Sequence, residues 1–284
     1  MRFVKALFLA AALAAPAAAL AADAKEPVNA GPYVPSPQSV VADMLKLADV
    51  GPKDFVIDLG SGDGRIVLTA AKVFGARGFG VEIQEHLVRQ SNEAARIQGV
   101  ADRVKFVNAD LFKTDISQAT VLTMYLLPNT VNMLKDKLLS ELRPGTRIIS
   151  HDYPLAGWIP EKYVQMDLED KVAISGVTTT LIYLYVVPAK LAPSWTATLP
   201  AALSREPVRL SLRQQITRVS GTARIGGREA AIEEGRLRGE QLSFRLLAAG
   251  RNYDFTGTVK GDVIEGTVNG PGLKAAAWSA AAAK

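Results

Sequence analysis

DLGSGDGR, from Asp58 to Arg65, is typical of a tight loop between a strand and a helix, because it follows the apolar run 55–57 and precedes the amphipathic run 66–71. Glycines in such a turn permit positive φ angles and let a ligand approach the main chain closely. A carboxylate at Asp58 disfavours a pyrophosphate beside the loop and favours a cationic amino-acid group. The stretch therefore predicts a ligand site for a positively charged molecule, with a purely structural glycine turn as the alternative.

Strand and helix patterns alternate over the first two thirds of the chain. Such alternation predicts a Rossmann-like α/β fold, in which helices cover both faces of a mostly parallel sheet. A long β-branched run over 177–187 predicts a late strand that is either at the edge or antiparallel. The expected strands are 55–59, 78–83, 104–108, 120–125 and 146–150, and the expected helices are 39–47, 64–73, 84–98 and 130–142.

The pattern changes beyond residue 188, where short alternating runs and turn residues replace helical spacing. These runs predict a small antiparallel β meander or barrel from Trp195 to Trp278, with hairpin turns at 226–227 and 260–262. Three Gly-Thr pairs, beginning at 221, 257 and 266, resemble one another as a repeated hairpin unit, and the alanine-rich tail is expected to be a closing strand. The expected divisions are a signal peptide (1–22), an extended segment (23–37), an α/β domain (38–188), a linker (189–194) and a β domain (195–284).

The composition excludes several kinds of site. The chain has no cysteine, so disulfides, thiolate nucleophiles and cysteine metal sites are impossible, and two histidines without metal-ligand spacing predict no metal. A net charge of +5 permits an acidic partner or a membrane surface without requiring either. The ten arginines between Arg205 and Arg251 alternate with glutamates, which is typical of a solvated strand surface, with an anionic ligand as the alternative. No recognised nucleic-acid motif accompanies them, so no nucleic-acid partner is expected.

The amino terminus is typical of an export signal. Arg2 and Lys5 precede the apolar run 6–20, and a small-x-small site predicts cleavage near Ala21 or Ala22. The run is short for a spanning helix, which needs about 20 residues. We therefore expect an exported, periplasmic protein, with an uncleaved inner-membrane anchor as the alternative. Membrane association is possible in both cases.

The spacing Asp-x-Gly-x-Gly-x-Gly resembles the first motif of class I S-adenosylmethionine (SAM) methyltransferases, whereas the dinucleotide fingerprint spaces its glycines G-x-G-x-x-G. The resemblance implies SAM as the cofactor. Glu82 ends the second strand and is placed to accept hydrogen bonds from two ribose hydroxyls, a position that NAD proteins share. Asp110 ends the third strand, where a methyltransferase residue accepts from the adenine amine. The expected cofactor-binding residues are Asp58, Gly60, Gly62, Gly64, Glu82 and Asp110.

Four stretches taken together are similar to the lysine methyltransferases that modify the mitochondrial adenine nucleotide translocase and the ATP synthase c subunit, and to their prokaryotic relatives. They are YVPSP (33–37), DLGSGDGR (58–65), YLLP (125–128) and PGTRIISH (144–151). The similarity covers about Tyr33 to Val187 and implies a protein substrate, with methyl transfer to a lysine amine. The eukaryotic members carry a hydrophobic targeting segment in place of the expected signal, and they lack an obvious counterpart of the β domain. The sequence specifies neither the acceptor nor the oligomeric state.

An acceptor lysine must lose a proton from an amine whose ordinary pKa is near 10.4. A desolvated slot with oxygen acceptors can orient that amine and help to deprotonate it. Tyr125 is the expected wall of the slot and Asn129 its expected acceptor, with core packing and capping of the next helix as the alternatives. His151 and Asp152 follow the fifth strand and could line the substrate side.

Two further functional classes stay open. The chain could be a SAM- or nucleoside-binding module without catalysis. It could also be an envelope interaction protein that works through its β domain.

Overall fold

The computed structural model describes residues 31–169, 171–172 and 176–283. The expected signal peptide and most of the expected extended segment lie outside the described residues. No helix within the described ranges is long and apolar enough to cross a membrane.

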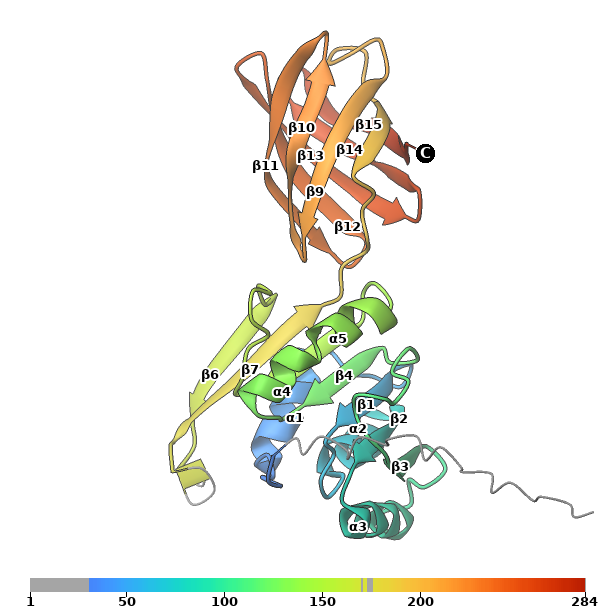
Figure 1. The fold of residues 1–284 in the computed structure, drawn as a ribbon, viewed down its shortest axis with the longest axis vertical. Helices are drawn as coiled ribbons and strands as arrows, with labels where there is room; N and C mark the ends of the chain where they lie inside the picture. Colours follow the sequence, from blue (N-terminus) through green and yellow to red (C-terminus); the bar gives the residue numbers. More distant parts are fainter. Residues whose placement is uncertain (1–30, 170, 173–175, 284) are drawn as a thin grey trace, which may run out of the picture.

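The first part of the chain folds into a seven-stranded sheet whose strand order is β3-β2-β1-β4-β5-β7-β6 (Figure 1). The strands are β1 (Phe55–Leu59), β2 (Arg77–Glu82), β3 (Val104–Asn108), β4 (Val121–Met124), β5 (Arg147–His151), β6 (Lys162–Asp167) and β7 (Thr179–Val186). β1 to β5 run parallel to one another, and β7 is antiparallel to both β5 and β6. The sheet confirms the Rossmann-like prediction.

Helices cover both faces of this sheet. They are α1 (Gln38–Leu47), α2 (Arg65–Phe74), α3 (Glu85–Ile97), α4 (Pro128–Met133) and α5 (Lys135–Glu141). One face packs against α1, α2 and α3, and its buried residues include Val56 and Phe106. The other face packs against α4 and α5 and includes Ile57 and Leu122, so neighbouring β1 residues point to opposite layers, as the two-residue period of a strand requires.

The structure differs from the sequence predictions for this part in two details. The expected single helix over 130–142 is two helices that meet at Leu134, and the first begins at Pro128, which is favoured at the first helical position. β6 was not predicted, because most of its residues are exposed and apolar alternation is limited to Val164 and Met166. β7 is antiparallel, which is one of the two alternatives predicted for it, and it lies between β5 and β6 rather than at the edge of the sheet.

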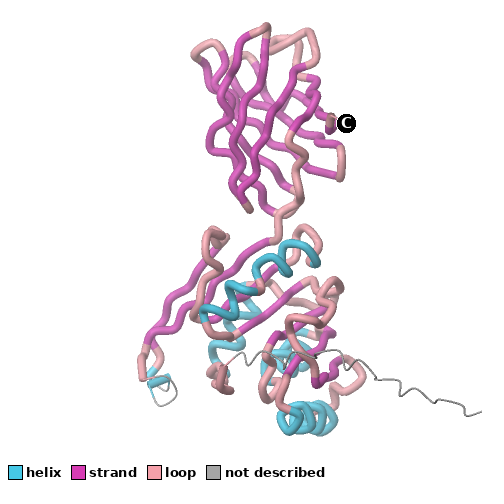
Figure 2. The backbone as a smooth tube through the Cα atoms, in the orientation of Figure 1, coloured by secondary structure: helices cyan, strands magenta, loops and turns pink. Residues whose placement is uncertain are grey.

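The second part is a closed, antiparallel, eight-stranded barrel (Figure 2). Its strands are β8 (Ser194–Thr198), β9 (Val208–Gln215), β10 (Arg218–Ile225), β11 (Arg228–Arg238), β12 (Gln241–Ala248), β13 (Arg251–Lys260), β14 (Val263–Gly270) and β15 (Leu273–Ala282). β15 pairs with both β14 and β8, so the alanine-rich tail closes the barrel as expected. The barrel interior is a core of side chains, in which Trp278 meets the rings of Phe244 and Phe255 edge-on.

The Gly-Thr pairs lie within strands rather than at hairpins, which corrects the repeat prediction. Gly257 and Gly266 face each other in the β13–β14 ladder. A Cβ atom on Gly257 would lie 3.0 Å from the ring of Trp278, so the missing side chain makes room for the indole. The turn expected at Gly226 and Gly227 is present, and both residues have the positive φ angles of a two-residue hairpin loop.

The barrel attaches at the end of the sheet where the parallel strands begin. β7 runs antiparallel to β5 and therefore ends at that side, and the chain enters β8 a few residues later. The amide of Ala189 donates to the carbonyl of Gly239, and Glu161 forms ion pairs with Arg236 and Arg238 of β11. The carboxyl ends of the parallel strands consequently face away from the barrel.

Candidate active site

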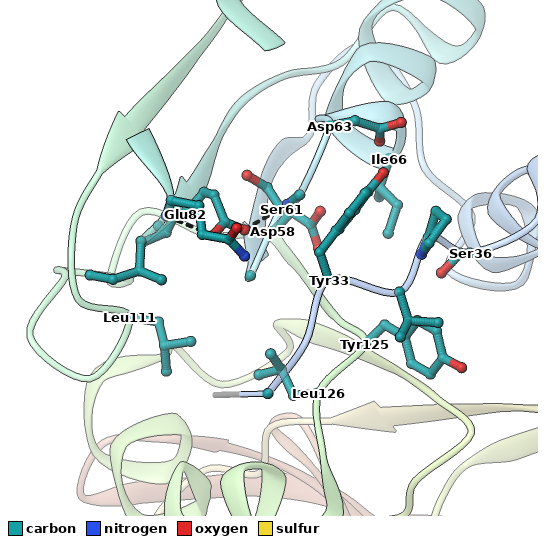
Figure 3. Close-up of a pocket in the computed structure, with 18 of the residues that line it drawn as sticks. Tyr33, Ser36, Asp58, Ser61, Asp63, Ile66, Glu82, Leu111, Tyr125 and Leu126 are labelled. Carbon is teal, nitrogen blue, oxygen red and sulfur yellow. Dashed lines mark hydrogen bonds between the residues drawn. The ribbon is translucent and has the colours of Figure 1, made fainter. Parts of the chain in front are cut away.

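A cavity of about 1060 Å³, open mouth included, lies at the carboxyl ends of the parallel strands (Figure 3). Its walls come from the segment 31–36, the glycine loop after β1, the residues after β2 and β3, and the residues after β4. Asp58, Glu82 and Asp110 all line it. The structure therefore brings the three expected carboxylates to one site, because parallel strands end at the same edge of a sheet.

Asp58 lies in the floor of the cavity and is 2% exposed. Its Oδ1 atom accepts a hydrogen bond of 2.7 Å from the hydroxyl of Thr123 on β4. Burial raises the pKa of the Asp58 carboxyl to about 7; the Thr123 hydrogen bond opposes this shift, whereas the neighbouring Glu82 and Asp63 carboxylates add to it. A cationic ligand group would stabilise the ionised form of this carboxylate.

Glu82 is held by the main chain around it. Its Oε2 atom accepts from the amide of Gly62 and its Oε1 atom from the amide of Gln84, both at 2.9 Å. Each carboxylate oxygen keeps further acceptor capacity for a ligand hydroxyl. The contacts fix the carboxylate in the cavity wall and tie the end of β2 to the glycine loop.

Asp110 follows β3, and one of its carboxylate oxygens binds the main chain two residues further along. Its Oδ1 atom accepts from the amide of Phe112 at 2.8 Å, and its Oδ2 atom lies 3.8 Å from the amine of Lys113. Ala109 and Leu111, on either side of it, add apolar surface to the same wall. This part of the cavity suits a flat ring that carries a hydrogen-bond donor.

The glycine loop divides into lining and supporting residues. Gly60 and Gly62 line the cavity, and both have positive φ angles. Gly64 was expected at the cofactor, but it is not among the lining residues. It precedes α2 and faces Phe106, whose ring would lie 2.6 Å from a Cβ atom on Gly64. Its small size serves the packing of α2 against the sheet.

The segment 31–36 crosses the cavity as a strap (Figure 3). The ring of Tyr33 covers the glycine loop, since a Cβ atom on Gly62 would lie 2.3 Å from it. Arg65 holds the strap: its Nη1 atom donates to the carbonyl of Ser36 at 2.8 Å, and its Nη2 atom pairs with Asp63 at 2.6 Å. Although burial raises the pKa of the Asp63 carboxyl, these contacts with Arg65 outweigh it and lower the pKa below its ordinary value.

Tyr125 forms a wall of the cavity but turns its hydroxyl away from Asp58 and Glu82 (Figure 3). That hydroxyl donates to Asp152 at 3.0 Å, and the ring lies 3.9 Å from the ring of His151. Burial, with the Asp152 charge, raises the pKa of the Tyr125 hydroxyl far above its ordinary value. Tyr125 therefore stays protonated and offers an aromatic face rather than a base.

A buried cluster supports Tyr125 from behind. The Nζ atom of Lys171 lies 2.8 and 2.7 Å from the two oxygens of Asp152, and the hydroxyl of Ser36 lies 2.8 Å from Nδ1 of His151. Burial lowers the pKa of His151 to about 4, so its imidazole is neutral at pH 7. Neither His151 nor Asp152 lines the cavity, which places both behind the expected substrate side.

Asn129 does not reach the cavity. It is exposed in the first turn of α4 and is absent from the lining residues. The alternative of a helix cap is also wrong, because α4 begins at Pro128 and Leu127 occupies the capping position without a side-chain hydrogen bond. The early start of the helix carries the Asn129 side chain away from the wall that Tyr125 and Leu126 form.

Several residues around the site were not among those expected from the sequence. Tyr33 and Ser36 stand in the YVPSP stretch, whose resemblance to a family motif was the only signal for them. Tyr153 follows the fifth strand directly after the expected His151 and Asp152. Lys171 had no local signal, since a single lysine among charged neighbours gives no indication that it will be buried.

The donor set fits SAM. Asp58 offers a buried carboxylate for an ammonium, Glu82 an acceptor for a ribose diol, and the walls around Asp110 apolar surface with an acceptor for adenine. No cluster of three or more potential metal ligands occurs in the part of the chain that the structure describes.

Comparison with known proteins gives one family and several relatives. The family model described as the ANTKMT methyltransferase domain matches residues 58–162. A protein-lysine N-methyltransferase of Saccharolobus islandicus is 43% identical over 157 residues, which cover 55% of this chain and 93% of that protein. An adenine nucleotide translocase lysine N-methyltransferase of Mus musculus is 33% identical over 156 residues, which cover 55% of this chain but only 63% of the mouse protein.

A solved structure is similar as well. It is the crystal structure of a protein described as an RNA methyltransferase from Salinibacter ruber, in complex with S-adenosyl-L-homocysteine, and it is 45% identical with a TM-score of 0.50. The similarity covers 56% of this chain and 96% of that one.

Proposed function

The chain belongs to the ANTKMT methyltransferase family, and from that premise we propose that it transfers the methyl group of SAM to the ε-amino group of a lysine in a protein. The observation that carries the proposal is the similarity to the archaeal protein-lysine N-methyltransferase, which extends over nearly the whole of that relative. The cavity with its three carboxylates gives the proposal a physical basis.

SAM supplies a methyl group that its sulfonium has already activated. The protein therefore needs mainly to hold and orient the cofactor and the acceptor amine and to exclude water. Asp58 would hold the ammonium, Glu82 the ribose hydroxyls and Asp110 the adenine amine. Gly60 and Gly62 let the main chain approach the ligand, and the Tyr33 strap covers it. Binding of the ammonium favours the ionised Asp58, whose pKa is about 7 in the free protein.

The acceptor side lacks a side-chain base among the described lining residues near Tyr125. The Tyr125 hydroxyl is bound to Asp152, and the neutral His151 lies behind the ring. Tyr125, Leu126 and Tyr153 instead form a partly apolar wall that disfavours a charged amine. We infer that the acceptor amine gives its proton to water and enters neutral, so the rate should rise with pH as the neutral fraction of the amine grows.

Transfer of a labelled methyl group from SAM to whole-cell extract, followed by mass spectrometry of the labelled products, tests the proposal. Label on the ε-amine of a protein lysine, lost with Asp58→Asn and retained with the exposed control Asp102→Asn, is the expected result. SAM binding without incorporation into any product would instead favour a non-catalytic binding module. No binding of SAM at all would overturn the proposal together with the assigned site.

RNA is the second candidate acceptor, because the similar protein from Salinibacter ruber is described as an RNA methyltransferase. Nuclease and protease treatment of the labelled extract separates the two acceptors. Label that survives protease and disappears with nuclease would replace lysine by an RNA base.

We further propose that the chain acts at the cell envelope, either exported to the periplasm or anchored in the inner membrane. The basic start and apolar run of residues 1–22 support this. An exported enzyme would need SAM outside the cytosol, whereas an anchored one could keep its catalytic domain inside. Cell fractionation with a reporter fused after Lys284 tests the compartment, and a reporter found only in the soluble cytosol would contradict both forms.

A further inference from the structure

The barrel carries a face of arginines that the methyl-transfer site does not use. We define the arginine face as the outward positions of β8, β9 and β10. Its exposed arginines alternate with buried residues such as Leu210 and Val219. They are Arg209, Arg213, Arg218 and Arg224.

The strand register gathers these arginines. Arg209 stands opposite Arg224, Arg213 opposite Ser220 and Arg218 opposite Gln215 in the β9–β10 ladder. β8, the neighbour of β9 on the other side, places Thr196 beside Arg209. Sequence positions in β8, β9 and β10 include no aspartate or glutamate, so the three adjacent strands carry positive charge alone.

Most of this charge is uncompensated. Among the described residues, Arg209, Arg213 and Arg218 have no carboxylate within 4.0 Å, and Arg224 has one partner, Glu229, at 3.5 Å with both side chains mostly exposed. Like charges that stand opposite each other on a sheet destabilise it. Of these four arginines, Arg209 and Arg224 stand opposite each other in the β9–β10 ladder, and an anionic partner would relieve their repulsion.

The end of the arginine face that is nearest the methyltransferase domain lines a cleft beside that domain. The cleft has about 940 Å³ of space, open mouth included, and Arg213, Arg218 and Arg236 line it together with Ile159. Glu234 also lines it, but Arg245 pairs with that carboxylate at 2.8 Å, and Arg236 lies 3.3 Å from Glu161. Arg213 and Arg218 are diagonal neighbours in the β9–β10 ladder and line the same cleft, and guanidinium groups are suited to binding phosphate oxygens.

We propose that the arginine face docks the protein on an anionic phospholipid surface. Serine, threonine and glutamine fill the outward positions between the arginines, and no outward aromatic or large apolar side chain lies among them. The core of a protein interface is rich in aromatic and apolar residues, and a single-stranded RNA site uses aromatic rings for stacking. Binding to a membrane surface requires neither an apolar core nor stacking rings, because mobile lipid phosphates can pair with widely spaced guanidinium groups.

The arginine face is separate from the catalytic cavity. The barrel follows β7 at the end of the sheet where the parallel strands begin (Figure 1), whereas the residues that line the cavity lie at the other ends of these strands. No residue of the arginine face lines the cavity, so docking through this face does not occupy the site of methyl transfer.

Sedimentation of the full chain with phosphatidylcholine vesicles, with and without phosphatidylglycerol, tests the proposal. We expect binding to increase with phosphatidylglycerol and to fall with salt. Each arginine near an anionic surface contributes about a fivefold change in affinity, so Arg213→Ala with Arg218→Ala should weaken binding about 25-fold. The control pair Arg251→Ala with Lys274→Ala removes the same charge from exposed positions on other strands and should change binding less than about threefold.

Three outcomes would overturn the proposal. One is equal binding to both kinds of vesicle, and another is an equal loss in the two double variants. The third is displacement from vesicles by a single-stranded RNA or by inorganic phosphate under conditions in which chloride of the same ionic strength does not displace the protein, which would assign the face to that ligand. Unchanged SAM affinity and thermal midpoints that do not fall in either double variant establish that the comparison reports the surface and not a loss of the fold.

Discussion

At the scale of the residue, the site depends on how burial alters each ionisable group. Asp58 and His151 are both buried, yet burial acts on them in opposite directions. It raises the pKa of the carboxyl to about 7 and lowers that of the imidazole to about 4, because in both groups it disfavours the charged form. Both groups are therefore poised between charge states within the range where the protein can be assayed.

The Tyr125→Phe variant tests whether Tyr125 only forms a wall of the cavity or also acts as a general base. The Tyr125 hydroxyl points to Asp152, so its removal keeps the aromatic face on the cavity. We expect kcat to fall less than about tenfold, whereas loss of a general base would cost about 10² to 10⁴. Tyr125→Ala, which removes the wall, should raise the KM for the acceptor and lower kcat together. Steady-state kinetics with the labelled acceptor makes the distinction, and a thousandfold loss in the phenylalanine variant would make Tyr125 the base.

SAM affinity should depend on pH through Asp58. Below its pKa of about 7 the carboxyl is protonated, and an ammonium must first displace that proton. The Kd should therefore rise about tenfold for each pH unit between about pH 7 and about pH 5. Asp58→Asn should bind weakly and without this slope. Calorimetric titration across the range checks both, and an equal slope in the asparagine variant would assign the dependence to another group.

His151 should make a pH-dependent contribution to the stability of the fold. The unfolded chain accepts a proton at its ordinary pKa of about 6.5, but the folded chain does so only near 4, so protons favour the unfolded state between these values. The His151 contribution to the free energy of unfolding should fall by about 3 kcal/mol as the pH drops through this window, whereas Asp58, whose pKa burial raises, contributes in the opposite sense. His151→Gln should remove this contribution, and the exposed control His86→Gln should retain it. Urea unfolding at a series of pH values measures the difference.

At the scale of the element, the strap over the cavity is the part that a ligand must displace or reorder. It has no regular secondary structure and is held by the carbonyl of Ser36, which accepts from Arg65, and by the ring of Tyr33 on the glycine loop. We therefore expect the barrier to ligand exchange to depend on the Arg65 side chain of α2 and on the Tyr33 ring of the strap.

Arg65→Ala should speed the release of SAM. It removes a hydrogen bond from a charged donor, which contributes about 1.5 to 3 kcal/mol, so the dissociation rate should rise at least about tenfold. Arg65→Lys should be intermediate, because an ammonium cannot reproduce the fork that meets both Asp63 and Ser36. Arg89→Ala, in an exposed pair with Glu85, is the control. Stopped-flow displacement measures the rates, and equal rates in all variants would mean that the strap does not limit release.

At the scale of the whole molecule, two cores are joined by a short connection. The barrel core and the sheet cores have separate buried residues, and contacts such as those of Glu161 with Arg236 and Arg238 bridge them. No described residue of the barrel lines the catalytic cavity. Cofactor binding and barrel docking are therefore physically separable.

A chain that ends at Pro188 should keep its cofactor site. Because the cavity lies at the opposite end of the sheet from the barrel, we expect the Kd for SAM to change less than about threefold, although the lost contact of Ile216 with the sheet core should lower the thermal midpoint. Calorimetry and thermal unfolding of the shortened chain test this. A large loss of affinity in a protein that still unfolds cooperatively would show that the barrel shapes the site.

The sequence by itself determined the alternating strands and helices, the closing strand of the barrel, and the meeting of Asp58, Glu82 and Asp110. These follow from local periodicity and from the rule that parallel strands end at one edge. Only the tertiary structure decided that Asn129 turns away, that Gly64 supports rather than lines the cavity, and that β6 exists. It alone placed Lys171 against Asp152 and Ser36 against His151, a pair whose members are 115 positions apart. Such contacts depend on how distant elements pack, and no local pattern of residues encodes them.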